Sequence, residues 1–257
     1  MPDTGFAMSW TRRLFAAAAL GMAFSASASA ADVTVFAAAS LADALSAIGK
    51  GFESTSGHHV VFNFGASSDL ARQVRAGAPA DVFFSADQAQ MDVVTQAGLV
   101  RGADRVDVLS NTLVVVVPAK TPRRLQVASE IASFDRLALA DPQAVPAGVY
   151  AKKYLESIGL WSRLADRIVP TLNVRGALAA VESENVPAAI VYRTDAAISS
   201  RVAVAFEVPR AAGPAIVYVM APLARASAAA RLFAAELTST RAARVYEKYG
   251  FIVLARK

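Results

Sequence analysis

The sequence alternates short, unbroken apolar runs with longer segments in which apolar residues recur every three or four positions. Unbroken runs are typical of β-strands that are covered on both faces, and the three-to-four spacing is typical of amphipathic α-helices. Strands are predicted at 33–36, 60–64, 82–84, 113–117, 136–140, 188–192 and 215–220. The helical spacing is clearest at 41–52 and returns at 150–158, 176–183 and 226–249. This alternation predicts an α/β protein with mainly parallel sheets.

Two of the apolar runs are candidates for strands that cross between lobes. The run at 113–117 is followed directly by Pro118, and the run at 215–220 is followed two residues later by Pro222. A chain that crosses out at the first run and back at the second would form two lobes, and its length is sufficient for that. We therefore expect lobe I to comprise residues 31–112 and 221–257, and lobe II to comprise residues 113–220.

Residues 1–30 are predicted to be a secretory signal peptide and not part of the fold. Arg12 and Arg13 precede an apolar run at 14–24, which is too short to span a bilayer. Ala28-Ser29-Ala30 then matches the small-residue pattern of a cleavage site. The mature chain is expected to begin at Ala31 or Asp32 and to be periplasmic.

The chain contains no cysteine, which excludes disulfides, thiolate metal sites and the cysteine-anchored type of export signal. It carries 26 Lys and Arg against 21 Asp and Glu, and the basic residues are scattered rather than clustered. A nucleic-acid partner is therefore not expected. The small positive excess favours an anionic ligand only weakly, because most surface charge is solvated.

Two predicted strands end in small residues and a hydroxyl immediately before a helix pattern. Ser40 follows three alanines after the first strand, and Ser67 lies in Gly65-Ala66-Ser67-Ser68-Asp69 after the second. In parallel sheets such strand ends meet at one edge, and helix N-termini can bind anions there. Ser40 with Asp43 three residues on also fits a capping box, which by itself would explain the serine without a ligand.

Residues suited to enzyme chemistry are few. The two histidines, His58 and His59, are adjacent at a strand start and are predicted to lie on the surface. Ser67 is not in a nucleophile elbow, because no glycine lies two residues after it. Asp81 and Asp87 flank a short strand, and we interpret them as caps rather than as a metal pair. A secreted serine hydrolase that uses Ser67 and one histidine remains an alternative.

Six blocks of sequence, in one order, resemble the periplasmic molybdate-binding proteins of ABC importers. They are FAAASL (36–41), FGASSDLARQV (64–74), AGAPADVFFSADQ (76–88), DPQAVPAGVYAK (141–152), NVRGALAAVE (173–182) and IVYRTDA (190–196). The resemblance runs from about residue 32 to residue 252. It implies a two-lobed, type II periplasmic binding protein, in which each lobe is a mainly parallel sheet flanked by helices and the ligand lies in the cleft between the lobes.

The resemblance also implies a site and a role. The ligand would be molybdate, and usually tungstate, held by neutral hydrogen-bond donors, with no direct bond from the protein to molybdenum and no other cofactor. The donors would be the hydroxyl groups and amides of Ser40 and Ser67, the amides of Ala147 and Val174, and the phenol of Tyr192. The protein would be a monomer and not an enzyme, and it would deliver the anion to the membrane permease of an ABC importer.

Several alternatives stay open. Another oxyanion, such as sulfate, could occupy the same site. Ferric-ion binders of similar architecture use paired tyrosines and carboxylates, whereas Tyr192 has no adjacent tyrosine. Amino-acid binders need a paired Arg and Asp, and Arg175 keeps that class open, although we interpret Arg175 as part of a structural ion pair. The sequence does not explain Asp43, whose charge would oppose an anion bound at the neighbouring Ser40.

Overall fold

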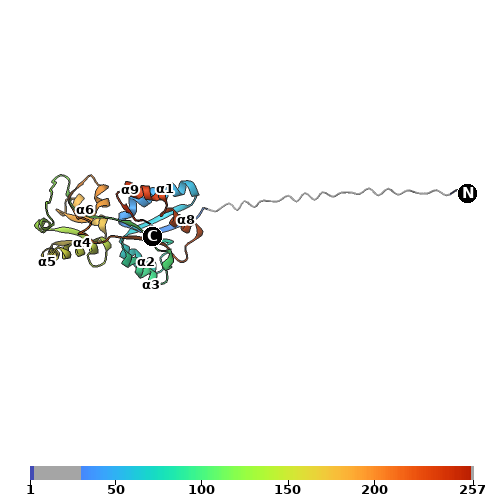
Figure 1. The fold of residues 1–257 in the computed structure, drawn as a ribbon, viewed down its shortest axis with the longest axis horizontal. Helices are drawn as coiled ribbons and strands as arrows, with labels where there is room; N and C mark the ends of the chain where they lie inside the picture. Colours follow the sequence, from blue (N-terminus) through green and yellow to red (C-terminus); the bar gives the residue numbers. More distant parts are fainter. Residues whose placement is uncertain (3–29, 256–257) are drawn as a thin grey trace.

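The computed structural model describes residues 1–2 and 30–255. The predicted signal peptide, residues 1–30, therefore lies outside the described residues except at positions 1, 2 and 30. The described chain forms two α/β lobes that lie side by side, each built on one β-sheet (Figure 1). This arrangement confirms the predicted two-lobed α/β class. None of the helices in the described part is long and apolar enough to cross a membrane.

The first lobe contains a six-stranded sheet in the order β11-β4-β10-β3-β1-β2. Its strands are β1 (Asp32–Ala38), β2 (His59–Gly65), β3 (Val82–Ser85), β4 (Val106–Ser110), β10 (Tyr218–Pro222) and β11 (Ile252–Val253). One face is covered by α1 (Ala42–Ser56), α8 (Ala228–Glu236) and α9 (Thr240–Lys248), and the other by α2 (Ser67–Arg75) and α3 (Gln88–Gln96) (Figure 1). Two short 3₁₀ helices, η1 (Ala39–Leu41) and η2 (Gly102–Asp104), lie in its connections.

The second lobe contains a five-stranded sheet in the order β7-β6-β8-β5-β9. Its strands are β5 (Leu113–Pro118), β6 (Leu137–Ala140), β7 (Ile168–Thr171), β8 (Ala189–Tyr192) and β9 (Val202–Glu207). Its helices are α4 (Pro146–Ser157), α5 (Trp161–Leu164), α6 (Val174–Glu182) and α7 (Arg193–Ala197). The 3₁₀ helices η3 (Ala128–Ser133) and η4 (Ala165–Arg167) complete this lobe.

Both sheets are mixed, and each has a parallel half. β1 runs parallel to β2 and β3, and β6 runs parallel to β7 and β8. β10 is antiparallel to β3 and β4, and β5 is antiparallel to β8 and β9. The sheets are therefore mixed and not mainly parallel as predicted, and parallel pairing is confined to the half of each sheet in which strands alternate with helices. The antiparallel half contains the strands next to the passages between the lobes.

The chain passes from the first sheet to the second between β4 and β5, and it returns between β9 and β10. The outward passage agrees with the predicted start of lobe II at residue 113. The return does not agree, because residues 218–222 form β10 within the first sheet, so the predicted boundary at residue 220 falls inside a strand of lobe I. The apolar residues 215–217 made the predicted strand begin too early.

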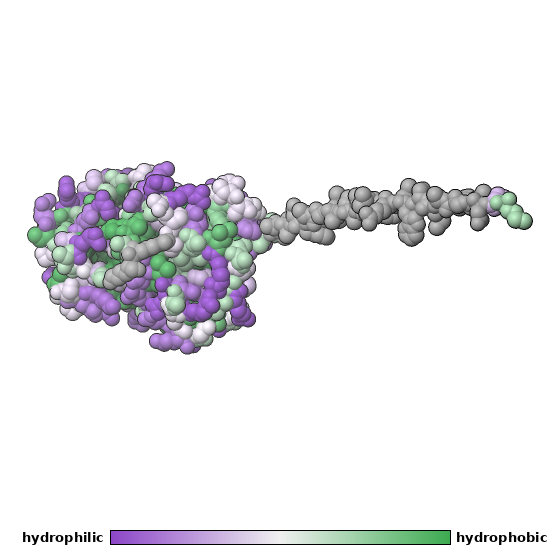
Figure 2. All heavy atoms as spheres, turned by 45° about the vertical axis from the view of Figure 1, so that its right-hand side comes forward, coloured by the Kyte–Doolittle hydropathy of each residue, from purple (hydrophilic) through white to green (hydrophobic). Residues whose placement is uncertain are grey.

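Burial on both faces explains the unbroken apolar strands. In β3, Val82 and Phe84 join the core under α1, α8 and α9, whereas Phe83 joins a separate core under α2 and α3. Successive strand residues point to opposite faces, so a strand covered on both sides is apolar at every position. In Figure 2 hydrophilic residues alternate with apolar ones on the face shown, which is usual because apolar atoms contribute much of the surface of a folded protein.

One glycine allows a helix to approach a strand closely. Gly148 lies in the first turn of α4, where a Cβ atom would come 2.0 Å from the carbonyl oxygen of Ala140 and 2.6 Å from that of Asp141. Backbone atoms cannot rotate aside as the end of a side chain can. Gly148 therefore lets the N-terminus of α4 pack directly onto the end of β6.

We expect Gly148→Ala to displace the first turn of α4 and to lower the free energy of unfolding by about 1–3 kcal/mol, the usual range for overpacking. Chemical denaturation measures this change. Gly51→Ala is a matched control, because Gly51 also lies in a helix but has no atom within 4 Å of the added Cβ. Alanine there should be neutral or stabilise the fold by up to about 1 kcal/mol. Equal destabilisation of both variants would contradict the close-packing explanation.

Candidate binding site between the lobes

A small cavity lies where the two lobes meet. Its wall includes all five predicted site residues: Ser40, Ser67, Ala147, Val174 and Tyr192. The cavity volume is about 10 Å³, close to the least that admits one water-sized sphere. In this arrangement the cavity can enclose a ligand of only a few atoms. A larger hollow beside β4 and α9 is lined by residues of the first lobe and by none of these five.

Ser40 and Ser67 reach the cavity from the first lobe. Ser40 is buried in η1, between β1 and α1, and Leu41 rather than Ser40 is the N-cap of α1, without a side-chain cap bond. The predicted capping box of Ser40 and Asp43 is therefore wrong, because a 3₁₀ turn separates the strand from the helix. Ser67 is the first residue of α2, and its Oγ accepts a hydrogen bond from the amide of Ala86 (3.0 Å).

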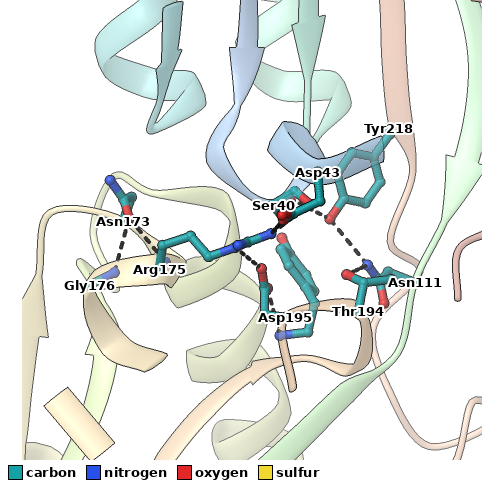
Figure 3. Close-up of polar contacts among 10 residues, drawn as sticks. Ser40, Asp43, Asn111, Asn173, Arg175, Gly176, Thr194, Asp195 and Tyr218 are labelled. Carbon is teal, nitrogen blue, oxygen red and sulfur yellow. Dashed lines mark hydrogen bonds and ion pairs between the residues drawn. The ribbon is translucent and has the colours of Figure 1, made fainter. Parts of the chain in front are cut away.

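Ala147 and Val174 reach the cavity at helix starts in the second lobe. Ala147 follows Pro146, the first residue of α4, and Val174 is the first residue of α6. Amides in the first turn of a helix have no acceptor within that helix. The side chain of Asn173 caps α6 by accepting from the amides of Arg175 and Gly176, and it does not take the amide of Val174 (Figure 3).

Tyr192 ends β8 and brings a hydroxyl group to the cavity wall. The side chain is 1% exposed, and its hydroxyl is buried with no hydrogen-bond partner. An unpaired buried hydroxyl costs free energy, so a ligand or a water molecule that pairs with it is favoured. Burial raises the pKa of Tyr192, and the phenol therefore keeps its proton and can donate it to an acceptor.

The cavity wall is formed by helix N-termini and not by charged side chains. Three helices, α2, α4 and α6, begin at its wall and direct their N-termini towards it. Among the described residues, none on the wall carries a charged side chain. Helix N-termini hold a partial positive charge and unpaired amides, so this arrangement suits a small anion bound without a counter-charge.

Arg175 lies beside the cavity and joins the two lobes by ion pairs (Figure 3). Its Nε contacts Oδ1 of Asp195 at 2.6 Å within the second lobe, and its Nη2 contacts Oδ2 of Asp43 at 2.7 Å in the first. This confirms the predicted structural ion pair and explains Asp43, whose carboxylate pairs with Arg175. With its charge compensated in this way, Arg175 does not provide the cationic contact of an amino-acid site.

Burial and the neighbouring opposite charge shift the pKa of Arg175 in opposite directions, and the same is true of Asp195. Burial disfavours the charged guanidinium, but the carboxylates of Asp195 and Asp43 outweigh it and raise the pKa of Arg175. Burial raises the pKa of Asp195 to about 6, although the guanidinium of Arg175 opposes that rise. The buried carboxylate of Asp195 is therefore stabilised by its ion pair with Arg175.

The other groups considered for chemistry lie elsewhere. Nδ1 of His58 accepts a hydrogen bond from the amide of Ala31, and Nδ1 of His59 lies 2.7 Å from Oε1 of Glu53. Asp81 accepts from the amide of Thr34, and Asp87 caps α3. Asp87 is therefore a helix cap as interpreted, whereas Asp81 binds an amide of the neighbouring strand β1, and neither histidine lies on the cavity wall with Ser67. No group of three His, Asp or Glu residues that could hold a metal occurs in the part of the chain that the structure describes.

Sequence reasoning missed the residues behind Ser40. The hydroxyl of Tyr218 lies 3.0 Å from Oγ of Ser40, and Nδ2 of Asn111 lies 3.3 Å from the same phenol oxygen. Asn111 precedes β5 and Tyr218 begins β10, so both lie next to the passages between the lobes. Ser40 and Tyr218 are 178 positions apart, and no local pattern indicates such a contact.

The fold and the cavity together define a two-lobed binding protein that encloses a small ligand between its lobes. The sequence matches the profile of the bacterial extracellular solute-binding proteins over residues 33–252, and the chain belongs to that family.

Individual relatives extend the comparison. The chain is 40% identical to the molybdate-binding protein ModA of Escherichia coli, over 93% of this chain and 97% of that protein. It is 38% identical to the molybdate-binding protein ModA of Haemophilus influenzae, over 91% and 94% of the two chains. The periplasmic molybdate-binding protein of Azotobacter vinelandii has the same fold, with a TM-score of 0.77 at 22% identity, and the match covers 87% of this chain and 100% of that one.

The contact between Arg175 and Asp43 should favour the closed arrangement of the lobes. We expect Asp43→Asn to increase the ratio of open to closed molecules roughly two- to fivefold, because a partly exposed ion pair contributes at most about 1 kcal/mol. Small-angle X-ray scattering of the ligand-free protein measures this as a larger radius of gyration.

Asp69→Asn is the matched control for this change. Asp69 has nearly the same side-chain exposure as Asp43, 41% against 42%, and it also pairs with an arginine, but its partner Arg72 is in the same helix. Its replacement should leave the radius of gyration unchanged. If the two variants expand equally, or if neither does, the Asp43 contact does not hold the lobes together.

Proposed function

We propose that this protein is the periplasmic solute-binding component of an ABC importer, which captures molybdate, and also tungstate, and delivers it to a membrane permease. It acts as a monomer after export and removal of residues 1–30, with no resident cofactor and without catalysing a reaction. The observation that carries the proposal is the buried, unpartnered hydroxyl of Tyr192 on a cavity that also collects three helix N-termini. The names of the Escherichia coli and Haemophilus influenzae relatives support molybdate as the ligand.

The proposed donors come from both lobes and surround the ligand. Ser40 and Ser67 donate from the first lobe through their hydroxyl groups and amides. Ala147 and Val174 donate through their amides from the second lobe, and Tyr192 donates through its phenol. Hydrogen bonds to a charged acceptor are stronger than neutral ones, and several of them in a site closed to water can replace the hydration of a dianion. Both lobes must contribute, so binding and lobe closure are coupled.

A wall of donors discriminates between oxyanions by their protons. Phosphate at neutral pH carries at least one O–H group, which finds no acceptor on such a wall and remains unpaired. That mismatch costs about 1–3 kcal/mol. Molybdate and tungstate carry no proton at this pH. Sulfate carries none either, and its shorter bonds to oxygen keep it from reaching all of the donors at once.

The contacts in the structure weigh against the other classes. An amino-acid site needs an arginine and a carboxylate in contact with the ligand, whereas none of the described wall residues is charged and Arg175 is already paired with two carboxylates. Ferric ion requires anionic ligands, and none of the described wall residues is a carboxylate. A serine hydrolase requires a histidine beside Ser67, whereas His58 and His59 make their contacts elsewhere. Sulfate is the alternative that the donor set permits.

We expect isothermal titration calorimetry to show one tight site for molybdate and for tungstate on the purified mature protein. Sulfate and phosphate should bind at least a hundredfold more weakly, a difference of about 3 kcal/mol. A competition series of the four anions on ligand-free protein provides the measurement. Sulfate that binds as tightly as molybdate would overturn the selection by size.

Side-chain and backbone donors should respond differently to substitution. Ser67→Ala removes a hydroxyl donor and should weaken molybdate binding by about 1.5–3 kcal/mol, the range for hydrogen bonds to charged groups. Val174→Ala keeps the amide and should leave the affinity nearly unchanged, even though loss of a buried side chain lowers stability. Calorimetry gives the affinities, and thermal melting confirms that both variants are folded. Loss of binding in folded Val174→Ala would contradict the proposed use of its amide.

A further inference from the structure

Two hydroxyl groups meet at the hydrogen bond between Ser40 and Tyr218, and either could be the donor. The two oxygens lie 3.0 Å apart and both residues are buried (Figure 3). The direction of this bond matters because Ser40 is on the cavity wall. If Ser40 donates to Tyr218, its proton is used and only its lone pairs face a ligand. If Tyr218 donates to Ser40, the proton of Ser40 is available for a ligand.

The side-chain amide of Asn111 decides the direction. Its Oδ1 accepts a hydrogen bond from the amide of Thr112 (2.9 Å). This contact fixes the orientation of the side-chain amide, so Nδ2 is the atom that faces Tyr218. Nδ2 donates one hydrogen to Oγ1 of Thr194 (2.9 Å) and the other to the phenol oxygen of Tyr218 (3.3 Å). An NH₂ group only donates, and the phenol oxygen therefore accepts at this contact.

Tyr218 then has one proton left to give. Burial raises the pKa of Tyr218, so the phenol remains protonated. Its one described neighbour that can accept this proton is Oγ of Ser40, at 3.0 Å. With one lone pair of Ser40 occupied in this way, the hydroxyl proton of Ser40 has no other described partner and can turn towards the cavity.

We propose that Tyr218 is a specificity-determining positioning residue, which receives a hydrogen bond from Asn111 and donates one to Ser40, and so makes Ser40 a donor to the bound oxyanion. This inference rests on the proposed function and extends it to a residue that does not line the cavity. Ser67 is placed in the same way by another group, since its Oγ accepts from the amide of Ala86. Both serines present protons to the cavity, and an oxyanion that carries its own proton is rejected.

Tyr218→Phe tests the role of Tyr218 without changing the shape of the ring. Without the phenol, the lone pairs of Ser40 are free to accept a proton from inorganic phosphate. We expect molybdate affinity to fall about two- to fivefold, because Ser40 keeps its proton but loses the neutral hydrogen bond that orients it. Phosphate should gain affinity, because its O–H group then finds an acceptor on Ser40, so the ratio of phosphate to molybdate affinity rises at least tenfold. The ratio of sulfate to molybdate should stay constant, because sulfate carries no proton.

Tyr246→Phe is the matched control. Tyr246 is as deeply buried as Tyr218, but its hydroxyl donates to the carbonyl of Leu237, away from the cavity. This variant should keep all three affinities. A purely structural role for Tyr218 would weaken the three anions by the same factor, and phosphate that competes no better against Tyr218→Phe than against the wild type overturns the proposal.

A double-mutant cycle tests whether Tyr218 acts through Ser40. In a Ser40→Ala background, Tyr218→Phe should produce no further change in the ratio of phosphate to molybdate affinity. A ratio that rises as much in this background as in the wild type shows that Tyr218 acts by another route and contradicts the inference.

Asn111→Asp provides a second variant that reverses the order of donors. A carboxylate accepts where the amide donates, so Tyr218 gives its proton to residue 111 and must accept from Ser40. The titration is made at about pH 8.5, where phosphate is a dianion like molybdate, so the added charge weakens both alike. The reversal should still raise the phosphate ratio, and an unchanged ratio counts against the proposal. A wild-type protein that binds no molybdate would refute the proposed function instead, so the two failures are distinguishable.

Discussion

A cavity that no charged side chain enters can hold a doubly charged anion only if helix N-termini, backbone amides and hydroxyl groups together replace its hydration. That requirement fixes much of this architecture. Helix N-termini must converge on one point, and a strand–helix unit of a parallel half-sheet places its helix start at the strand end. Here α2 follows β2 in the first lobe, while α4 follows β6 and α6 follows β7 in the second. Two lobes are needed because starts from a single sheet edge face the ligand from one side only.

Because the proposed donors lie on two lobes, the bound state depends on how the lobes are held together. Arg175 takes part in this because it follows Val174 directly in α6 and contacts Asp43 of the other lobe. Val174, whose amide is one of the proposed donors, is thus next to the residue that bridges the lobes. Asp195, at the other end of the ion-pair trio, also accepts from the amide of Tyr192. The ion pairs that join the lobes are therefore directly linked to two of the proposed donors, Val174 and Tyr192.

Local patterns were sufficient to predict the α/β class and to single out Ser40 and Ser67, because strands buried on both faces and small residues at helix starts are visible in a sequence. Ala147, Val174 and Tyr192 were selected only through the resemblance to the molybdate-binding family, since a helix start or a strand end does not by itself indicate a ligand. Local patterns failed where a long-range contact or a short turn decides the outcome. The 3₁₀ turn at 39–41 displaced the expected cap from Ser40, and β10 joined the first sheet although the apolar run that contains it began earlier. Asp43 was unexplained until Arg175, 132 positions away, was placed beside it.

Selectivity for a proton-free anion requires more than a set of groups that can donate, because a serine hydroxyl can also accept. The discrimination becomes firm only when another group occupies the acceptor side of each hydroxyl. For Ser67 that group is a backbone amide at the end of β3, which the fold supplies whatever the side chain there. For Ser40 it is the phenol of Tyr218, whose own orientation depends on Asn111. The two serines therefore differ in how their donor role can be lost: the role of Ser67 is built into the backbone, whereas that of Ser40 depends on side chains beside the passages between the lobes.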